Sequence, residues 1–197
     1  MIEKLKKLDT KISEKLKIKD TSSPLFRAAA LFARSGDSWL WCGILFVLWL
    51  IHSGETERTL AFWGGSIALT AVFVLFLKRL IARSRPEGEW GKIYRKGDPY
   101  SFPSGHAVRA GLILVLAVNT FRNPVVILLF ILWAILMILS RVATGVHYLL
   151  DILAGFLLGL FIGGIFIQLQ PWIYKTFPIL FDKSSWFGVK LEIRDMK

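Results

Sequence analysis

Residues 152–174 read ILAGFLLGLFIGGIFIQLQPWIY, an uninterrupted run of 23 residues without a charged side chain. The hydrocarbon core of a bilayer is about 30 Å thick and is crossed by roughly 20 helical residues. Outward from this run, further uncharged stretches cover 38–54, 59–77 and 123–140. Segment 104–121 joins them, because only His106 and Arg109 interrupt its apolar character. The pattern therefore predicts transmembrane helices rather than the buried helices of a soluble protein.

The composition agrees with this interpretation. Of the 197 residues, 54% are hydrophobic, with eight Trp and fifteen Phe, whereas soluble domains average about 45–50% apolar even when glycine is counted. Aromatic rings are enriched where a protein meets lipid headgroups. We predict an all-α, polytopic membrane helix bundle of about five transmembrane helices. Their expected bounds are 38–53, 59–82, 104–121, 124–143 and 147–169.

The two ends of the chain differ from its middle. Residues 1–36 place apolar side chains at helical spacing among lysines, which predicts an amphipathic segment on the membrane surface. A solvated tail and a shallow dip of 22–36 into the membrane are alternatives, although Arg27 and Arg34 argue against a full span. The expected organisation is a membrane-surface segment 1–36, a transmembrane domain 37–170 and a C-terminal tail 171–197.

Charge and metal-ligand content exclude several classes of function. The formal net charge is +11, from 25 Lys and Arg against 14 Asp and Glu. Because the basic residues flank uncharged segments of membrane length, anionic lipid or a phosphorylated substrate fits this charge better than nucleic acid does. The three histidines, with His52 expected on the face opposite to the other two, and the lack of an acidic cluster make a poor metal site. We therefore predict no nucleic acid, metal or cofactor, and the lone Cys42 excludes an intrachain disulfide.

Alternating spans bring three polar clusters to one side of the membrane. The clusters are 78–86 at the end of the second predicted span, 103–106 at the start of the third, and 141–151 between the fourth and the fifth. Each has an ordinary structural explanation, since cations snorkel at helix ends and Pro-Ser-Gly can start a helix. Their coincidence on one side, next to membrane-embedded charges, favours a functional site.

Two spacings within these clusters predict contacts. Lys78 and Arg85 are seven residues apart, close to two helical turns, so they can share a helix face. His147 and Asp151 are four residues apart, so on a helix the carboxylate can accept a hydrogen bond from the imidazole. Such a pair is often purely structural when it stands alone.

Together the clusters carry the patterns K-x6-RP, PSGH and SR-x5-H-x3-D. These patterns resemble the three signature motifs of the type 2 phosphatidic acid phosphatase (PAP2) family of membrane lipid phosphatases. The matching positions are Lys78, Arg85, Pro86, Pro103, Ser104, Gly105, His106, Ser140, Arg141, His147 and Asp151. With the helices around the motifs, the resemblance extends over 38–169 and implies a PAP2/haloperoxidase-like core.

The resemblance implies a role for each motif residue in the hydrolysis of a phosphate ester. His147 is the expected nucleophile, forming a phosphohistidine, and Asp151 is expected to hold its tautomer and stabilise its positive charge. His106 is expected to protonate the leaving lipid oxygen and then to activate water. The expected phosphate-binding groups are Lys78, Arg85, Ser104, Gly105 and Arg141.

Other cations are open to two interpretations. Arg109 lies about one turn below His106 in an otherwise apolar helix, where it either snorkels to the interface or binds a second anionic group of the substrate. Four loop cations either meet a lipid headgroup or form a solvated face: Arg83, Lys92, Arg95 and Lys96.

The predicted function is hydrolysis of a lipid phosphate monoester or diphosphate, with membrane lipids as surroundings and no obligate protein partner. Candidate substrates are undecaprenyl diphosphate, phosphatidylglycerol phosphate, phosphatidic acid and the 1-phosphate of lipid A. The alternatives are a phosphotransferase that passes the same phosphohistidine to an acceptor other than water, and a non-catalytic membrane scaffold.

Two signals disagree about the side of the membrane on which the site lies. Five spans put the N-terminus and the site on the same side. The nine Lys and Arg within 1–37 favour the cytoplasm, whereas the resemblance implies the periplasmic face of a bacterial cytoplasmic (inner) membrane. Because a surface-bound helix distorts the charge count, we predict the outer face.

Overall fold

The computed structural model describes residues 2–87 and 97–181 and is built almost wholly of helices within those ranges. The helices are α1 (Ile2–Leu16), α2 (Pro24–Ser35), α3 (Ser38–Ile51), α4 (Glu55–Ile81), α6 (Gly105–Thr120), α7 (Pro124–Ala143), α8 (Leu149–Thr176) and the 3₁₀ helix η1 (Pro178–Phe181). The prediction of an all-α membrane helix bundle is confirmed. The end of the predicted tail, 182–197, and three of the loop cations lie outside the described residues: Lys92, Arg95 and Lys96.

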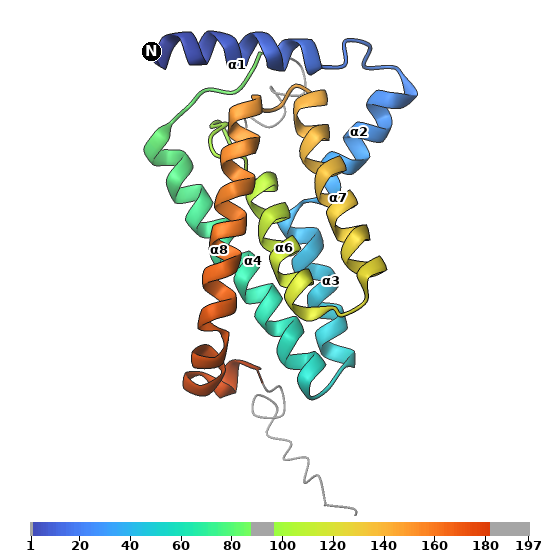
Figure 1. The fold of residues 1–197 in the computed structure, drawn as a ribbon, viewed down its shortest axis with the longest axis vertical. Helices are drawn as coiled ribbons and strands as arrows, with labels where there is room; N and C mark the ends of the chain where they lie inside the picture. Colours follow the sequence, from blue (N-terminus) through green and yellow to red (C-terminus); the bar gives the residue numbers. More distant parts are fainter. Residues whose placement is uncertain (1, 88–96, 182–197) are drawn as a thin grey trace, which may run out of the picture.

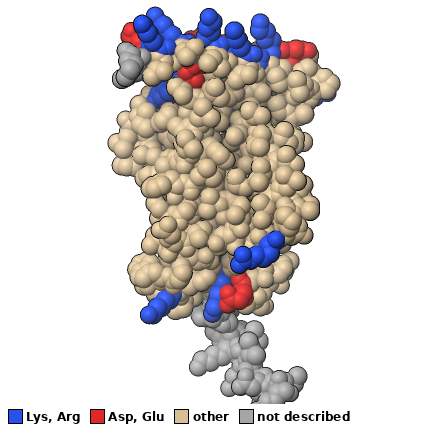
Figure 2. Space-filling model, in the orientation of Figure 1, with Lys and Arg blue, Asp and Glu red and all other residues tan. Residues whose placement is uncertain are grey.

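Successive helices run in alternating directions along the bundle (Figure 1). α2 and α3 descend from the end that carries the N-terminus, α4 returns, α6 descends, α7 returns and α8 descends. α1 lies across the end at which α4 and α7 finish and α6 and α8 begin. In the space-filling view, Lys and Arg gather over the two ends and leave an uncharged band between them (Figure 2). Such a band is what the hydrocarbon core of a bilayer requires.

The predicted spans take three different forms. α4, α7 and α8 are each long and apolar enough to cross a membrane, and α2 with α3 makes a fourth span that bends by 57° between the two helices. α6 has 16 residues, so it rises about 24 Å, which is less than a bilayer core. It packs against α4, α7 and α8 and begins deeper than the nearby ends of α7 and α8 (Figure 1). Protein rather than lipid therefore surrounds most of α6.

Two spans differ from their predicted bounds. α4 starts at Glu55 rather than at 59, and α8 runs from Leu149 to Thr176 rather than over 147–169. After α8 the chain folds back, and the rings of Tyr174 and Phe181 lie 4.8 Å apart. The later start of α8 matters for the site, because it leaves His147 in the turn before the helix.

Glycines bring the backbones of α6 and α8 into close contact. The glycines that leave no room for a side chain at this interface are Gly111, Gly155, Gly159 and Gly163, called here the glycine seam. A methyl group at Gly159 would collide with the carbonyl oxygen of Val108, whereas one at Gly164 would meet nothing within 4 Å. Small residues let membrane helices approach closely, so the glycine seam fixes α6 relative to α8.

The N-terminal helices are attached to the bundle by polar as well as apolar contacts. α2 packs along α7 and buries Phe26 and Ala33. α1 buries Asp9 and Ser13 against the start of α8. The exposed apolar side chains of α1 are Leu5, Leu8, Ile12 and Leu16. The division into a surface segment, a transmembrane domain and a tail stays a prediction.

Candidate active site

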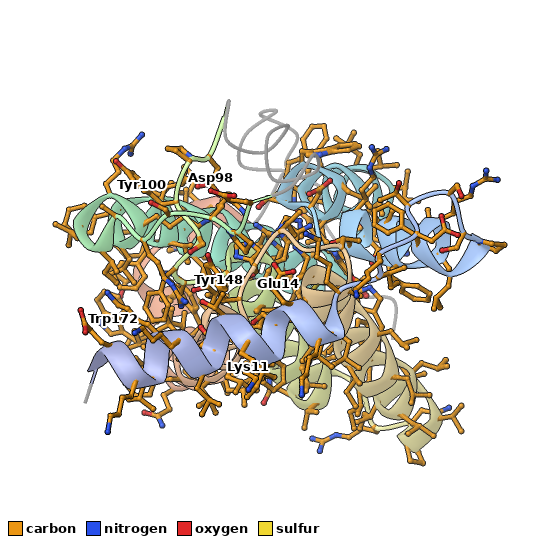
Figure 3. The ribbon with its side chains drawn as sticks, turned by 90° about the horizontal axis from the view of Figure 1, so that it is seen from above. Lys11, Glu14, Asp98, Tyr100, Tyr148 and Trp172 are labelled. Atoms are coloured by element: carbon orange, nitrogen blue, oxygen red, sulfur yellow. The ribbon has the colours of Figure 1, made fainter. Side chains whose placement is uncertain are left out.

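The three polar clusters meet at one cavity of about 380 Å³. Figure 3 looks onto this end of the bundle, with Asp98 and Tyr100 on one side and Tyr148 beside α1. The predicted site residues that line the cavity are Lys78, Arg85, Gly105, His106, Arg109, Arg141 and His147. Ser104 and Asp151 are fully buried behind this lining. Within the described ranges, no group of three or more His, Cys, Asp or Glu side chains is placed to hold a metal ion.

Lys78 and Arg85 share one carboxylate. Asp98 Oδ2 lies 2.5 Å from Lys78 Nζ and 2.7 Å from Arg85 Nη2. Burial lowers the pKa of the Arg85 guanidinium below its ordinary value, and the charge of Asp98 opposes that shift. The two cations face the same point although Arg85 follows α4 rather than lying on it. An arrangement that holds two cations on one carboxylate oxygen suits a phosphoryl oxygen equally well.

A sharp turn after α7 brings His147 next to Arg141. Gly145 has a φ of +70°, a left-handed conformation that glycine adopts readily. Its N–H donates to the Val142 carbonyl at 2.8 Å, and the Val146 N–H donates to the Arg141 carbonyl at 3.2 Å. These bonds end the helix and turn the chain so that both side chains line the cavity.

The contact between Arg85 and His147 defines the tautomer of the histidine. Arg85 Nη1 lies 3.2 Å from His147 Nε2, and a guanidinium can only donate hydrogen bonds. Nε2 therefore carries the lone pair and Nδ1 carries the proton. Burial, followed by the nearby charges of Arg141 and Arg85, holds the pKa of His147 well below its ordinary value. His147 is thus a neutral imidazole with its lone pair toward the cavity, the form required of a nucleophile.

Asp151 stands behind His147, but not in the predicted helical geometry. Tyr148 is the N-cap of α8, and Asp151 Oδ2 accepts its N–H at 3.0 Å. The distance from His147 Nδ1 to Asp151 Oδ2 is 3.6 Å, which is longer than a hydrogen bond. The predicted pairing on a helix is therefore wrong in its geometry: the carboxylate bonds to the N-cap of α8, and its Oδ2 faces Nδ1 of His147 without a hydrogen bond between them.

The bend between α2 and α3 belongs to the site. Asp37 Oδ1 lies 2.8 Å from His106 Nε2. A carboxylate at this distance stabilises the protonated imidazole, the form that can donate a proton. Arg109, one turn further along α6, donates to the Gly36 carbonyl and the Ser38 hydroxyl. The bend thus provides the carboxylate that contacts His106 and the two groups that accept hydrogen bonds from Arg109.

The start of α6 supplies neutral donors. Ser104 is the N-cap, and its N–H donates to the Asp151 carbonyl at 3.0 Å. The Ser104 hydroxyl is buried and has no hydrogen-bond partner among the residues that the structure describes. Gly105 begins the helix and lines the cavity, where the positive end of the helix dipole favours an anion.

We expect His147 to remain neutral in mildly acidic solution. Because burial and neighbouring cations disfavour the imidazolium, its pKa falls, and the neutral form persists below pH about 6.5, where a free histidine is half protonated. The double variant His52→Gln, His106→Gln leaves one histidine, whose titration can be followed by NMR of the labelled ring. A midpoint below that of a free histidine is expected, and a midpoint at or above the free value would contradict the inferred environment.

A family comparison matches the region that contains all three clusters. Residues 59–175, more than half of the chain, match the model of the PAP2 superfamily. This chain belongs to the PAP2 superfamily. The resemblance inferred from the three motifs is therefore confirmed, and the PAP2 region contains both predicted catalytic histidines, His106 and His147.

Several relatives of this PAP2 protein are named as lipid phosphatases. Lipid A 4'-phosphatase of Porphyromonas gingivalis is 29% identical over 169 residues, which cover 77% of this chain and 65% of the relative. Phosphatidylglycerophosphatase B of Haemophilus influenzae is 36% identical over 36% of this chain and 33% of its own length. Undecaprenyl-diphosphatase of Sulfolobus acidocaldarius is 39% identical over 38% of this chain and 36% of its own length. The chain therefore spans less than two thirds of these relatives.

Two solved structures share the fold of this PAP2 protein. LpxE of Aquifex aeolicus superposes with a TM-score of 0.63 at 22% identity, over 80% of this chain and 93% of LpxE. The first transmembrane PAP2-type phosphatidylglycerolphosphate phosphatase from Bacillus subtilis superposes with a TM-score of 0.65 at 23% identity, over 86% of this chain and 87% of that protein. With the apolar helices, this likeness identifies an integral membrane protein.

Three carboxylates near the PAP2 motifs have no clear signature in the sequence. Asp37, within SGDSW, has the pattern of a helix N-cap, and Asp98, within KGDPY, has that of a turn. Neither pattern indicates a partner on another helix, and the partner of Asp37 is 69 residues away. For Asp9 the available signal is its spacing of four residues from Ser13, because two polar side chains then share one side of α1.

Proposed function

We propose that this PAP2 protein is a membrane lipid phosphatase that works through a phosphohistidine on His147. The environment of His147 supports this most directly, because a neutral imidazole shares one cavity with Lys78, Arg85 and Arg141. Three cations balance the charge of a phosphoryl group, and a neutral imidazole attacks phosphorus without first losing a proton. The names of the relatives support the same class of substrate.

In the first step, the lone pair of His147 Nε2 forms a bond to phosphorus while the bond from phosphorus to the lipid oxygen breaks. Arg85 releases Nε2 by donating to a phosphoryl oxygen instead. The leaving oxygen keeps the electron pair and takes a proton from His106, whose protonated form Asp37 stabilises. The positive charge on the imidazole of His147 is balanced by Asp151, toward which Nδ1 points.

In the second step, a water molecule attacks phosphorus and gives a proton to His106, which is now basic. The bond between nitrogen and phosphorus breaks, and its electron pair returns to His147 Nε2 as phosphate leaves. The three cations of the cavity hold the phosphoryl oxygens in both steps, with neutral donors from Ser104 and Gly105. Atoms and charges balance over the two steps without a metal or a cofactor.

The proposed substrate is an amphiphile whose phosphate enters the cavity while its chain remains among apolar side chains. Residues of α3 and α4 supply apolar lining beside the cations, among them Trp39, Ile67, Val74 and Leu75. Undecaprenyl diphosphate, phosphatidylglycerol phosphate, phosphatidic acid and lipid A 1-phosphate all meet this description. The proposed orientation puts the site on the outer, periplasmic face of a bacterial cytoplasmic membrane.

A phosphate-release panel tests the proposal. The purified full chain, in mixed micelles, receives each of the four candidate lipids and a short-chain phosphatidic acid. Release of inorganic phosphate from at least one lipid is expected. Release from none of them would favour a non-catalytic scaffold. Glycerol added as an acceptor separates the remaining alternative, because a phosphotransferase would form glycerol phosphate at the expense of free phosphate.

Arg109 is expected to discriminate between substrates in the same panel. It lines the cavity and is held by Gly36 and Ser38. If its guanidinium also meets a second anionic group, Arg109→Ala lowers turnover of a lipid diphosphate about tenfold more than turnover of the short-chain monophosphate. Equal losses on both substrates would restrict Arg109 to holding the bend between α2 and α3.

A further inference from the structure

Arg83 joins two buried carboxylates from distant parts of the chain. Its Nη1 lies 2.8 Å from Asp151 Oδ1, and its Nη2 lies 2.7 Å from Asp9 Oδ2. The side chains of Asp9 and Asp151 are 2% and 0% exposed. The guanidinium also lies over the ring of Tyr148, 4.3 Å from its centroid. Arg83 is therefore engaged in ion pairs within the protein rather than forming part of a solvated face.

α1 also caps the first turn of α8. Asp9 Oδ1 accepts the Leu150 N–H at 3.0 Å, and Ser13 Oγ accepts the Leu149 N–H at 2.9 Å. The first N–H groups of a helix have no partner within it, and leaving them buried and unpaired is costly. α1 is thus bonded to the backbone immediately before Asp151, in addition to its ion pair with Arg83.

Asp151 faces two groups that compete for its negative charge. His147 lies on one side of it and Arg83 on the other. Burial, together with the cations of the cavity, disfavours a positive imidazole on His147. If Arg83 were paired with Asp151 alone, that pair would be neutral and would not offset a positive charge on the imidazole of His147. With Asp9 included, two carboxylates and one guanidinium leave one negative charge, which in a poorly solvated site acts strongly over short distances.

We propose that Arg83 and Asp9 are positioning residues for the reaction: Arg83 orients Asp151, and Asp9 balances Arg83 so that Asp151 keeps its negative charge toward His147. This role rests on the proposed function of His147 as nucleophile. Neither residue is a PAP2 motif position of this chain, and Asp9 comes from a helix outside the matched region. α1, which is predicted to lie on the membrane surface, would thereby supply part of the charge that the phosphohistidine needs.

Isosteric variants separate charge from shape. Asp9→Asn removes the charge but keeps an oxygen that can accept the Leu150 N–H. We expect it to lower kcat for a lipid phosphate about tenfold or more while KM changes less than about threefold, because Asp9 does not contact the phosphate. Adding Arg83→Gln restores a single negative charge, so this double variant is expected to be at least about threefold faster than Asp9→Asn alone.

Two matched variants control for indirect effects. Ser13→Ala removes the other contact between α1 and the first turn of α8 without a change of charge. Glu3→Gln makes the same charge change as Asp9→Asn at an exposed position of α1. Glu3→Gln is expected to keep kcat within about twofold of the unmodified enzyme, and Ser13→Ala, which leaves the Leu149 N–H unpaired without a change of charge, is expected to lose less kcat than Asp9→Asn. Unchanged kcat in Asp9→Asn, or a double variant no faster than Asp9→Asn, would overturn the positioning role.

A second measurement does not depend on activity. In the His52→Gln, His106→Gln background, Arg83→Gln is expected to raise the NMR titration midpoint of His147 by about one pH unit. Asp9→Asn is expected to lower it, and both changes together to leave it near the parent value. Shifts in the same direction, or none, would overturn the charge balance. This titration decides the inference even if no lipid phosphate is hydrolysed, and its failure in an active enzyme leaves the phosphatase assignment intact.

Discussion

His147→Ala is expected to abolish both phosphate release and formation of a phosphorylated enzyme, whereas His106→Ala is expected to form the phosphorylated enzyme and then to stall. Without the imidazole of His147 nothing accepts the phosphoryl group, so turnover is expected to fall by about 10³-fold or more. In His106→Ala the nucleophile and its cations remain. With p-nitrophenyl phosphate, whose leaving group needs no acid, this variant is expected to release about one equivalent of nitrophenol and then slow sharply.

Rapid-quench kinetics with labelled substrate measure the two outcomes directly. Label retained by protein that is stable in alkali and lost in acid identifies a phosphohistidine. His52→Ala is the matched control, because His52 is exposed and lies at the end of α3 remote from the cavity. Label on the His147→Ala protein, or turnover retained by it, would assign the nucleophile to another residue.

Gly159→Ala is expected to destabilise the bundle by about 3 kcal/mol or more, near or beyond the upper end for overpacked cores. The added methyl group would meet backbone rather than a flexible side chain, including the Val108 carbonyl carbon at 2.8 Å. α6 and α8 would have to separate, and they carry His106 and Asp151. The expected result is a large fall in the melting temperature in detergent together with loss of activity.

Gly164→Ala is the matched control for the glycine seam. It makes the same substitution five residues further along α8, where nothing lies within 4 Å of the new atom. Because alanine is favoured over glycine in a helix by about 1 kcal/mol, this variant is expected to melt at the same temperature or higher. Similar melting temperatures for the two variants would show that α6 and α8 do not rely on backbone contact.

Most of the fold follows from the apolar runs, because a chain in lipid must satisfy its backbone within a helix. Each of the five predicted spans overlaps one helix of the structure, although α6 is too short to cross a bilayer core by itself and α3 does so only together with α2. The attachment of α2 to the bundle was less accessible to prediction. Arg27 and Arg34 suggest a surface helix, yet both are exposed while Phe26 and Ala33 are buried against the bundle. The side of a short helix that packs against the protein depends on tertiary contacts, and these cannot be predicted from the helix's own sequence.

Some residues of the candidate site could likewise be predicted from the sequence, and others could not. The cations and histidines could be predicted, because their spacing along the chain reflects the ends of long helices. Asp37, Asp98 and Asp9 could not, since each meets its partner only after the chain has turned. The predicted hydrogen bond between His147 and Asp151 was also wrong, because the Tyr148 N–H at the N-cap of α8 binds the carboxylate of Asp151 instead. Local patterns identify helices and motifs, whereas the carboxylates that pair with the charged residues of a motif come from positions far away in the sequence.

The short central helix has a consequence for the energetics of phosphate recognition. α6 begins below the nearby ends of α7 and α8 (Figure 1), so an anion bound at its first turn would lie among protein side chains, below the end surface of the bundle. There the attraction of a guanidinium for an anion is several times stronger than in bulk water, and dissolved salt screens it less. The depth of α6 thus bears on the dielectric in which the proposed phosphoryl group would be held.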